Sequence, residues 1–123
     1  MRLIYFNSNI IINLFEARWS RESTNMARKV IKACNLQRNG ISIMLSNDKQ
    51  IQKLNHKWKG KNRPTNVLSF PNHEEFLKRK TQNYYLGDVI LAYETLKKEA
   101  FDGNILFLDH MSHLLVHGIL HLK

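Results

Sequence analysis

The chain has 123 residues, 43% of them hydrophobic, so it is long enough to form one domain with its own core. Its one cysteine, Cys34, excludes an internal disulfide framework and favours a reducing compartment, and no apolar run approaches the roughly 20 residues of a transmembrane helix. We therefore expect a cytoplasmic protein with no membrane association. The net charge of +9 favours a polyanionic partner, nucleic acid first, although a basic surface that only confers solubility fits the composition equally well.

The first third of the chain predicts a strand, a helix and a second strand. Leu3–Ile12 is rich in β-branched and aromatic residues and is predicted to be one strand. Trp19–Cys34 carries apolar residues at helical spacing and is predicted to be a helix. The Asn39-Gly40 pair marks a turn, and Ile41–Leu45 alternates as a half-buried strand does.

The middle of the chain predicts a short helix, a basic loop and a strand. Asn47 is a suitable N-cap for a helix that continues to Trp58. A basic loop, Lys59–Arg63, follows it, and Val67–Phe70 is predicted to be a strand that Pro71 stops.

The last third predicts a loop, a strand and two helices. The polar stretch 73–84 is predicted to be a mobile loop, and Leu86–Leu91 a strand. Helices are predicted over Ala92–Ala100 and Ile105–Leu122. Since strands and helices alternate, we predict an α+β fold in a single domain over 1–123, with a small mixed four-stranded sheet packed with helices.

Four histidines lie along one side of the predicted last helix. At 100° per residue, His110, His113, His117 and His121 fall within a sector of about 80°. His117 and His121 are four residues apart and could chelate one Zn²⁺ at the end of this helix, while a purely structural role is equally compatible. Gly118 stands where zinc peptidases with the His-Glu-x-x-His motif have their general base, which argues against a standard peptidase.

A second group of candidate residues surrounds an aromatic ring in Lys57–Pro71. Basic side chains beside Trp58 could hold a phosphate backbone while the ring stacks on a base. The alternative is a solvated loop with Trp58 in the core. Asp88, in the next predicted strand, could pair locally or orient a metal-bound histidine.

Three sequence blocks together resemble the YbeY family, bacterial endoribonucleases of rRNA maturation. The blocks are Leu54-Asn55 with Trp58–Lys61, then Pro64–Pro71, and finally Leu86–Val89 with His117–Leu122, in the family's order. The Thr-[Asp/Asn]-Val-Leu-Ser-Phe-Pro and His-Gly-x-Leu-His-Leu patterns are each specific. The family motif continues past the position of Lys123 with a third histidine, so the chain is expected to lack the family's C-terminal end.

The resemblance implies a zinc-dependent endoribonuclease specific for single-stranded RNA. It implies that His117 and His121 bind one Zn²⁺ per chain, the third histidine ligand being absent from this sequence. Lys59, where the family usually has arginine, is implied as the catalytic residue that stabilises charge on phosphate, with Trp58, Lys61 and Arg63 binding RNA. The implied process is 16S rRNA 3′-end maturation and 70S ribosome quality control, with rRNA and the small ribosomal subunit as partners.

Two other functions stay open at the level of the sequence. One is a non-catalytic protein of the same family that binds RNA or the ribosome, and the other is a metallohydrolase that acts on a substrate other than RNA. Because only two of three family ligands are present, we expect weak zinc binding and poor RNA cleavage by the chain as it stands.

Overall fold

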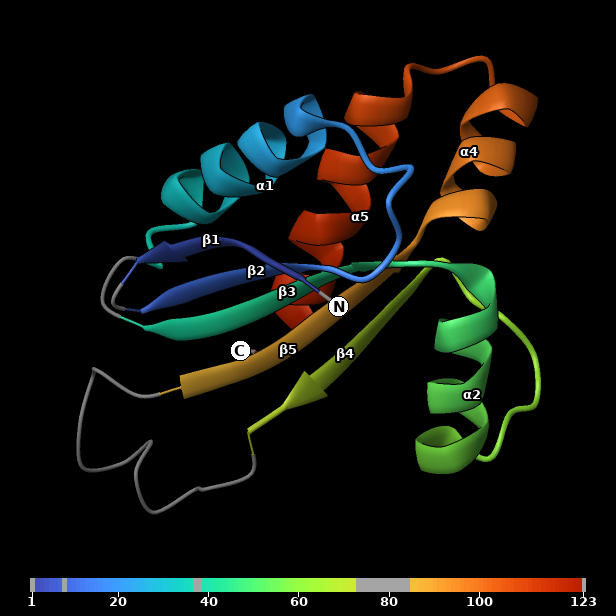
Figure 1. Ribbon diagram of the computed structural model, residues 1–123, viewed down its shortest axis with the longest axis horizontal. Coiled ribbons are helices and arrows are strands. Elements are labelled where there is room, and N and C mark those ends of the chain that lie inside the picture. The colour runs from blue at the N-terminus through green and yellow to red at the C-terminus, as the bar shows by residue number, and fades with distance from the viewer. Residues whose placement is uncertain (1, 8, 37–38, 73–84, 123) are drawn as a thin grey trace.

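The computed structural model of the chain describes residues 2–7, 9–36, 39–72 and 85–122 (Figure 1). The loop predicted over 73–84 lies outside the described residues. Within them the chain folds into a mixed sheet with helices on both of its faces, which confirms the predicted α+β class.

The sheet has five strands in the order β1-β2-β3-β5-β4, so the predicted number of four is wrong. Strands β2, β3 and β5 run parallel, while β1 and β4 are antiparallel edge strands. The strands are β1 Arg2–Asn7, β2 Ile10–Leu14, β3 Gly40–Ser46, β4 Val67–Pro71 and β5 Tyr85–Ala92.

The additional strand arises because the stretch predicted as one strand forms two. β1 and β2 pair antiparallel, and Asn7 lies opposite Ile10 in the register. Between them the sequence has Ser8 and Asn9, which follow Asn7 at the end of β1, and all three are residue types that favour turns. The high β-propensity on both sides of this short polar stretch made it resemble the interior of one long strand.

The helices divide between the two faces of the sheet. α1 (Arg21–Ala33) and α5 (Phe107–Leu122) pack on one face, α4 (Tyr93–Asp102) packs beside α5, and α2 (Asp48–Lys59) covers the other face (Figure 1). No single helix in the described ranges has the length and apolar composition needed to cross a membrane, and α4 and α5, which reach it only together, are bent by 117°.

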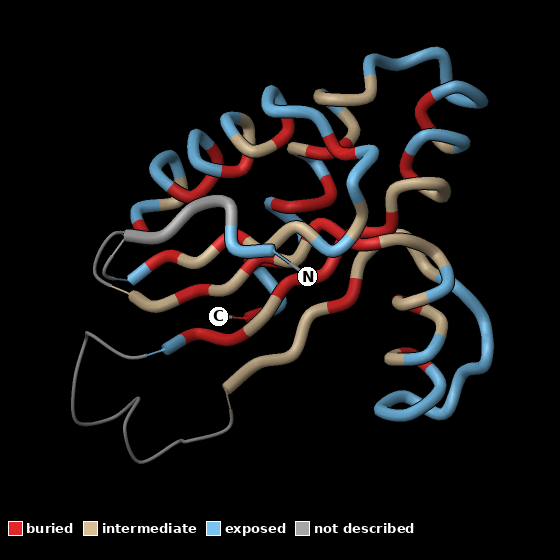
Figure 2. The backbone as a smooth tube through the Cα atoms, viewed as in Figure 1, coloured by how far each residue is buried: buried red, intermediate tan, exposed pale blue. Residues whose placement is uncertain are grey.

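Strand alternation builds a core on each side of the sheet. In β3, Ile41, Ile43 and Leu45 are fully buried against α1 and α5, whereas Met44 points to the α2 side. Figure 2 shows the buried stretches along the central strands and the facing sides of α1 and α5. The alternation read from 41–45 is therefore confirmed.

Both ends of α2 are determined by local chemistry. The Asn47 side chain accepts a hydrogen bond from the Gln50 amide at 2.8 Å, which confirms the predicted N-cap. At the other end Gly60 adopts a left-handed conformation with φ of 71° and ends the helix. Lys59 is consequently the last residue of α2 and not the first residue of a loop, so the predicted boundary is wrong by one residue.

Candidate active site

The C-terminal end of α5 presents two exposed histidines whose rings meet. The Nε2 atoms of His117 and His121 lie 3.0 Å apart, and the ring planes are inclined by 72°. Two nitrogen ligands of a tetrahedral Zn²⁺, each at 2.0–2.1 Å, are about 3.3 Å apart. The spacing and the imidazole chemistry of the pair therefore fit two positions of a zinc site after a small ring rotation.

Gly118 holds this end of the helix against the sheet. A Cβ atom at Gly118 would lie 2.9 Å from Val89 Cγ1 and 3.2 Å from Val67 Cγ2, so only glycine allows this approach. The Ser69 hydroxyl donates a hydrogen bond of 2.8 Å to the Gly118 carbonyl and ties β4 to α5. A glutamate at this position, as zinc peptidases require, has no room here.

Lys59 approaches the histidines from a different element. It lies at the end of α2, and together with β4 and the two histidines it lines a cavity of about 280 Å³. The Nζ of Lys59 is 5.6 Å from the centre of the Phe70 ring, within the range of a cation–π contact. The structure thus brings together the three residues predicted as catalytic or metal-binding, which are up to 62 positions apart in the sequence. The cavity is lined by Lys59, Val67, Leu68, Ser69, Pro71, His117 and His121.

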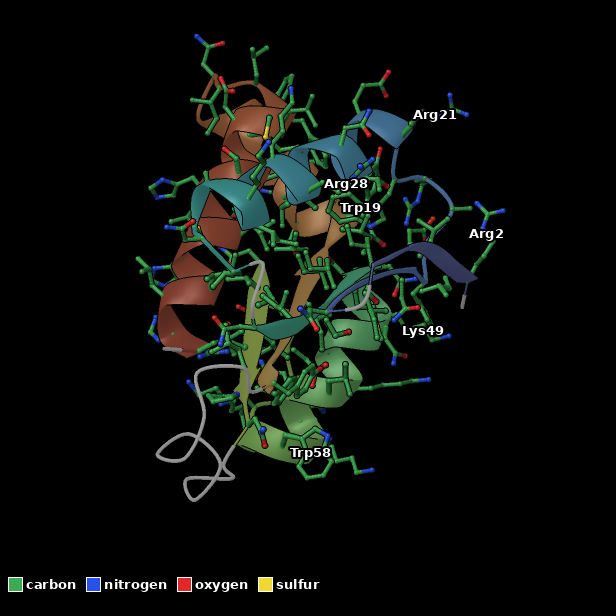
Figure 3. The ribbon with its side chains drawn as sticks, turned by 90° about the vertical axis from the view of Figure 1, so that its left-hand side faces the viewer. Arg2, Trp19, Arg21, Arg28, Lys49 and Trp58 are labelled. Atoms are coloured by element: carbon green, nitrogen blue, oxygen red, sulfur yellow. The ribbon has the colours of Figure 1, made fainter. Side chains whose placement is uncertain are left out.

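A larger cavity of about 620 Å³ adjoins Lys59 on the α2 side of the sheet. Trp58 lines it and is 62% exposed, at the end of α2 farthest from the core (Figure 3). The alternative that placed Trp58 in the core is therefore wrong. The cavity is lined by Ser42, Met44, Gln50, Leu54, Trp58, Lys59, Phe70, Pro71, Asp88 and Ile90.

Lys61 and Arg63, predicted to bind RNA, line neither cavity. They are exposed on a turn that the buried Asn55 organises, since its side-chain amide donates to the Arg63 carbonyl at 2.9 Å. The Lys61 amide in turn donates to the Asn55 carbonyl. The backbone of these two basic residues is consequently held against Asn55 in the last part of α2.

The four histidines of α5 do not form one group. His110 is largely buried and its Nε2 lies 2.9 Å from the Glu99 carboxylate, which also accepts hydrogen bonds from the Asn66 amide. His113 is exposed and lines a different cavity. Among the described residues no three His, Cys, Asp or Glu side chains are grouped so that they could hold a metal ion.

Asp88 belongs to the larger cavity and not to the histidines. It accepts a hydrogen bond from the Tyr85 hydroxyl, whereas the next residue, Val89, points to the opposite face and meets Gly118. Burial, followed by this hydrogen bond with Asp88, raises the pKa of Tyr85. Of the two interpretations of Asp88, the structure thus shows the local one, a hydrogen bond with a neighbouring residue of β5.

Ser69 and Gly118 contribute to the site without having been predicted as site residues. Their only sequence signal was their position inside the two specific blocks that carry the family resemblance. Positive charge is also found away from the site. Arg2, Arg21 and Lys49 extend from three elements on the side of the molecule opposite α5 in Figure 3.

Comparisons with known proteins agree on one family. The family model described as Endoribonuclease YbeY matches residues 7–123. Among curated proteins, the Endoribonuclease YbeY of Ehrlichia canis (strain Jake) is 35% identical over 122 residues, covering 92% of this chain and 76% of that protein.

A second relative is more similar over a shorter stretch. The Endoribonuclease YbeY of Paramagnetospirillum magneticum is 49% identical over 84 residues, which is 67% of this chain and 51% of that protein. The part of each relative that this chain covers is therefore between about half and three quarters of that relative's length. The solution structure of TM1509 from Thermotoga maritima matches with a TM-score of 0.61 and 25% identity, covering 90% of this chain and 71% of that one.

Proposed function

This chain belongs to the YbeY endoribonuclease family, and we propose that it cleaves single-stranded RNA at the cavity formed by α2, β4 and α5. The observation that carries the proposal is the meeting of His117, His121 and Lys59 around one cavity. A nuclease stabilises the negative charge that develops on a phosphodiester; here the Lys59 ammonium group from α2 and two imidazoles from α5 that can hold a metal ion meet at one cavity.

The two histidines would hold a zinc ion, and Lys59 would bind the substrate. A bound Zn²⁺ would supply Lewis-acid polarisation of a phosphoryl oxygen or an activated water. His117 and His121 would direct their Nε2 lone pairs toward one point, and Gly118 and Ser69 would fix the helix that carries them. Lys59 would attract the phosphate and stabilise the negative charge that develops on it. Ligands beyond the two imidazoles would come from water or substrate.

We further propose the biological process that the family resemblance implies. The substrate would be precursor 16S rRNA at its 3′ end, and the protein would act in the cytoplasm on rRNA and the small ribosomal subunit, including quality control of 70S ribosomes. The net charge of +9 supports an RNA partner, because it favours contact with a polyanion. Trp58, Lys61 and Arg63 would add contacts beside the cavity.

Cleavage of a labelled single-stranded RNA by the purified chain tests the proposal. We expect His117→Ala, His121→Ala and Lys59→Ala each to reduce cleavage strongly. The matched control is His113→Ala, since His113 is an exposed histidine on the same helix that lines a different cavity. Wild-type cleavage that persists unchanged in His117→Ala and His121→Ala would rule out this site.

A second candidate function is RNA binding without cleavage. The observation that favours it is that only two grouped histidines, and no third ligand, are found among the described residues. In that case the wild type would bind single-stranded RNA and leave it intact even with added Zn²⁺. A metallohydrolase of the peptidase type is disfavoured by the close packing around Gly118.

A further inference from the structure

The larger cavity shares a wall with the candidate active site. Lys59 and Pro71 line both the 620 Å³ cavity and the histidine cavity. We propose that the larger cavity receives a nucleobase of the bound RNA, and that Asp88 selects bases that present N–H donors. This inference rests on the proposed function in one respect, because it takes single-stranded RNA as the ligand.

The size and lining of the cavity suit a flat heterocycle. Its volume lies in the range of small-molecule pockets, about 300–1,000 Å³. The rings of Trp58 and Phe70 line it, and the exposed Trp58 ring is available for stacking. Three polar side chains lie among the apolar ones and can meet the edge of a base; they are Ser42, Gln50 and Asp88.

A hydrogen bond orients Asp88 so that it offers only acceptors to the cavity. The Tyr85 hydroxyl donates to Asp88 Oδ1, and Ser42 lies opposite Asp88 in the register of β3 and β5. Asp88 forms no ion pair with another described residue. The carboxylate oxygens held in this way accept hydrogen bonds from N–H partners.

The four bases differ in what they can offer to such a carboxylate. Guanine presents two adjacent N–H donors on its Watson–Crick edge, and adenine and cytosine each present an exocyclic amino group. The corresponding edge of uracil has one N–H between two carbonyl oxygens, which Asp88 repels. We therefore expect guanine to bind best and uracil worst.

The charge pattern also separates the two cavities by ligand chemistry. Lys59 lies on the wall that the two cavities share; beyond it the histidine cavity offers two imidazoles and no carboxylate, whereas the larger cavity has the carboxylate of Asp88, which repels a phosphate. A nucleotide whose phosphate lies at Lys59 can extend its base toward Trp58. This arrangement assigns the backbone to one cavity and the base to the other.

Equilibrium binding of four heptaribonucleotides tests the assignment. The probes are heptauridylate and the same RNA with a central A, C or G, measured by fluorescence anisotropy in chelator so that the RNA stays intact. We expect the wild type to bind the G-containing probe about tenfold more tightly than heptauridylate. Asp88→Asn should remove this ratio, since an amide can serve both donors and acceptors.

Two further variants keep the test decisive. Trp58→Ala changes an exposed side chain and should lower the affinity for all four probes about tenfold. The ratio between the affinities for the G-containing probe and heptauridylate should persist. Asp102→Asn is the charge-matched control, because Asp102 is exposed, is paired with Lys98 and lines neither cavity. It should leave both affinity and ratio unchanged.

The outcomes separate this inference from the proposed function. Equal wild-type affinities for the four probes, or an Asp88→Asn effect that is the same for all of them, would overturn the base-selecting role. If cleavage is then still lost in His117→Ala, the nuclease proposal stands without it. A base ratio that depends on Asp88 in a chain that never cleaves RNA would support the inference and refute the nuclease proposal.

Discussion

The two halves of α5 carry histidines in opposite surroundings. In the first half, His110 is 14% exposed and pairs with Glu99, whereas in the second half His117 and His121 are exposed and face each other across 3.0 Å. All of them lie on one side of the helix, so their spacing alone cannot separate them. The difference is that α4 provides a carboxylate for the first half, while the second half borders an open cavity.

The strongest way to test this contrast is to measure zinc binding. We expect His117→Ala and His121→Ala each to raise the Kd for Zn²⁺ at least about 100-fold, because even the hydrogen-bond partners of metal ligands are worth 10–100-fold. His110→Ala should leave the Kd unchanged. Isothermal titration of folded, metal-free protein measures all three, and an equal loss in His110→Ala would show that the two halves do not differ in this way.

The next largest effect is expected on RNA cleavage when Lys59, which lines the cavity together with the two histidines, is replaced. Lys59→Ala should reduce kcat/KM for RNA cleavage about 100-fold, the size of losing one group that stabilises transition-state charge. Lys59→Arg keeps the charge and adds a bidentate donor, so it should cleave at least as well as the wild type. Steady-state kinetics on one labelled RNA checks both, with Lys98→Ala as a control on the exposed surface of α4. A Lys59→Ala rate within twofold of wild type would remove Lys59 from the site.

Much of this site could be predicted from the sequence, because its predicted residues lie within short sequence motifs. His117 and His121 lie in one of the two specific patterns, Lys59 lies in the block Trp58–Lys61, and the structure brings these blocks together. The contrast between His110 and the other histidines could not be predicted, since it depends on Glu99 lying opposite it in the fold. The larger cavity could not be predicted from the sequence either, because Ser42 and Asp88 become neighbours only when β3 pairs with β5.

The fold shows the same division between local and non-local information. The alternation in 41–45, the cap at Asn47 and the final helix followed from local patterns. The split of Leu3–Ile12 into β1 and β2 did not, because both halves have high β-propensity and tertiary pairing decides where the chain turns.

A smaller effect tests how the second half of α5 is held on the sheet. Gly118→Ala places a Cβ atom 2.9 Å from Val89 Cγ1, so we expect a loss of about 1–3 kcal/mol in the free energy of unfolding. Val116→Ala is the control, since Val116 is on the outer side of the same helix and should change stability by less than about 0.5 kcal/mol. Urea unfolding measures both, and a Gly118→Ala variant as stable as the wild type would mean that the contact with β4 and β5 relaxes freely.

The smallest effect isolates the first half of the helix. A double-mutant cycle with His110→Ala and Glu99→Ala should give a coupling free energy of about 1 kcal/mol in urea unfolding, because the pair is partly buried and hydrogen-bonded. The same cycle on His117 and His121 in metal-free protein should give a coupling near zero, since both imidazoles are exposed to water. The first half of α5 would then contribute a stabilising side-chain pair, and the second half would contribute the metal ligands. Equal coupling in the two cycles would mean that all these histidines serve the fold, and that the cavity beside Lys59 needs another source of chemistry.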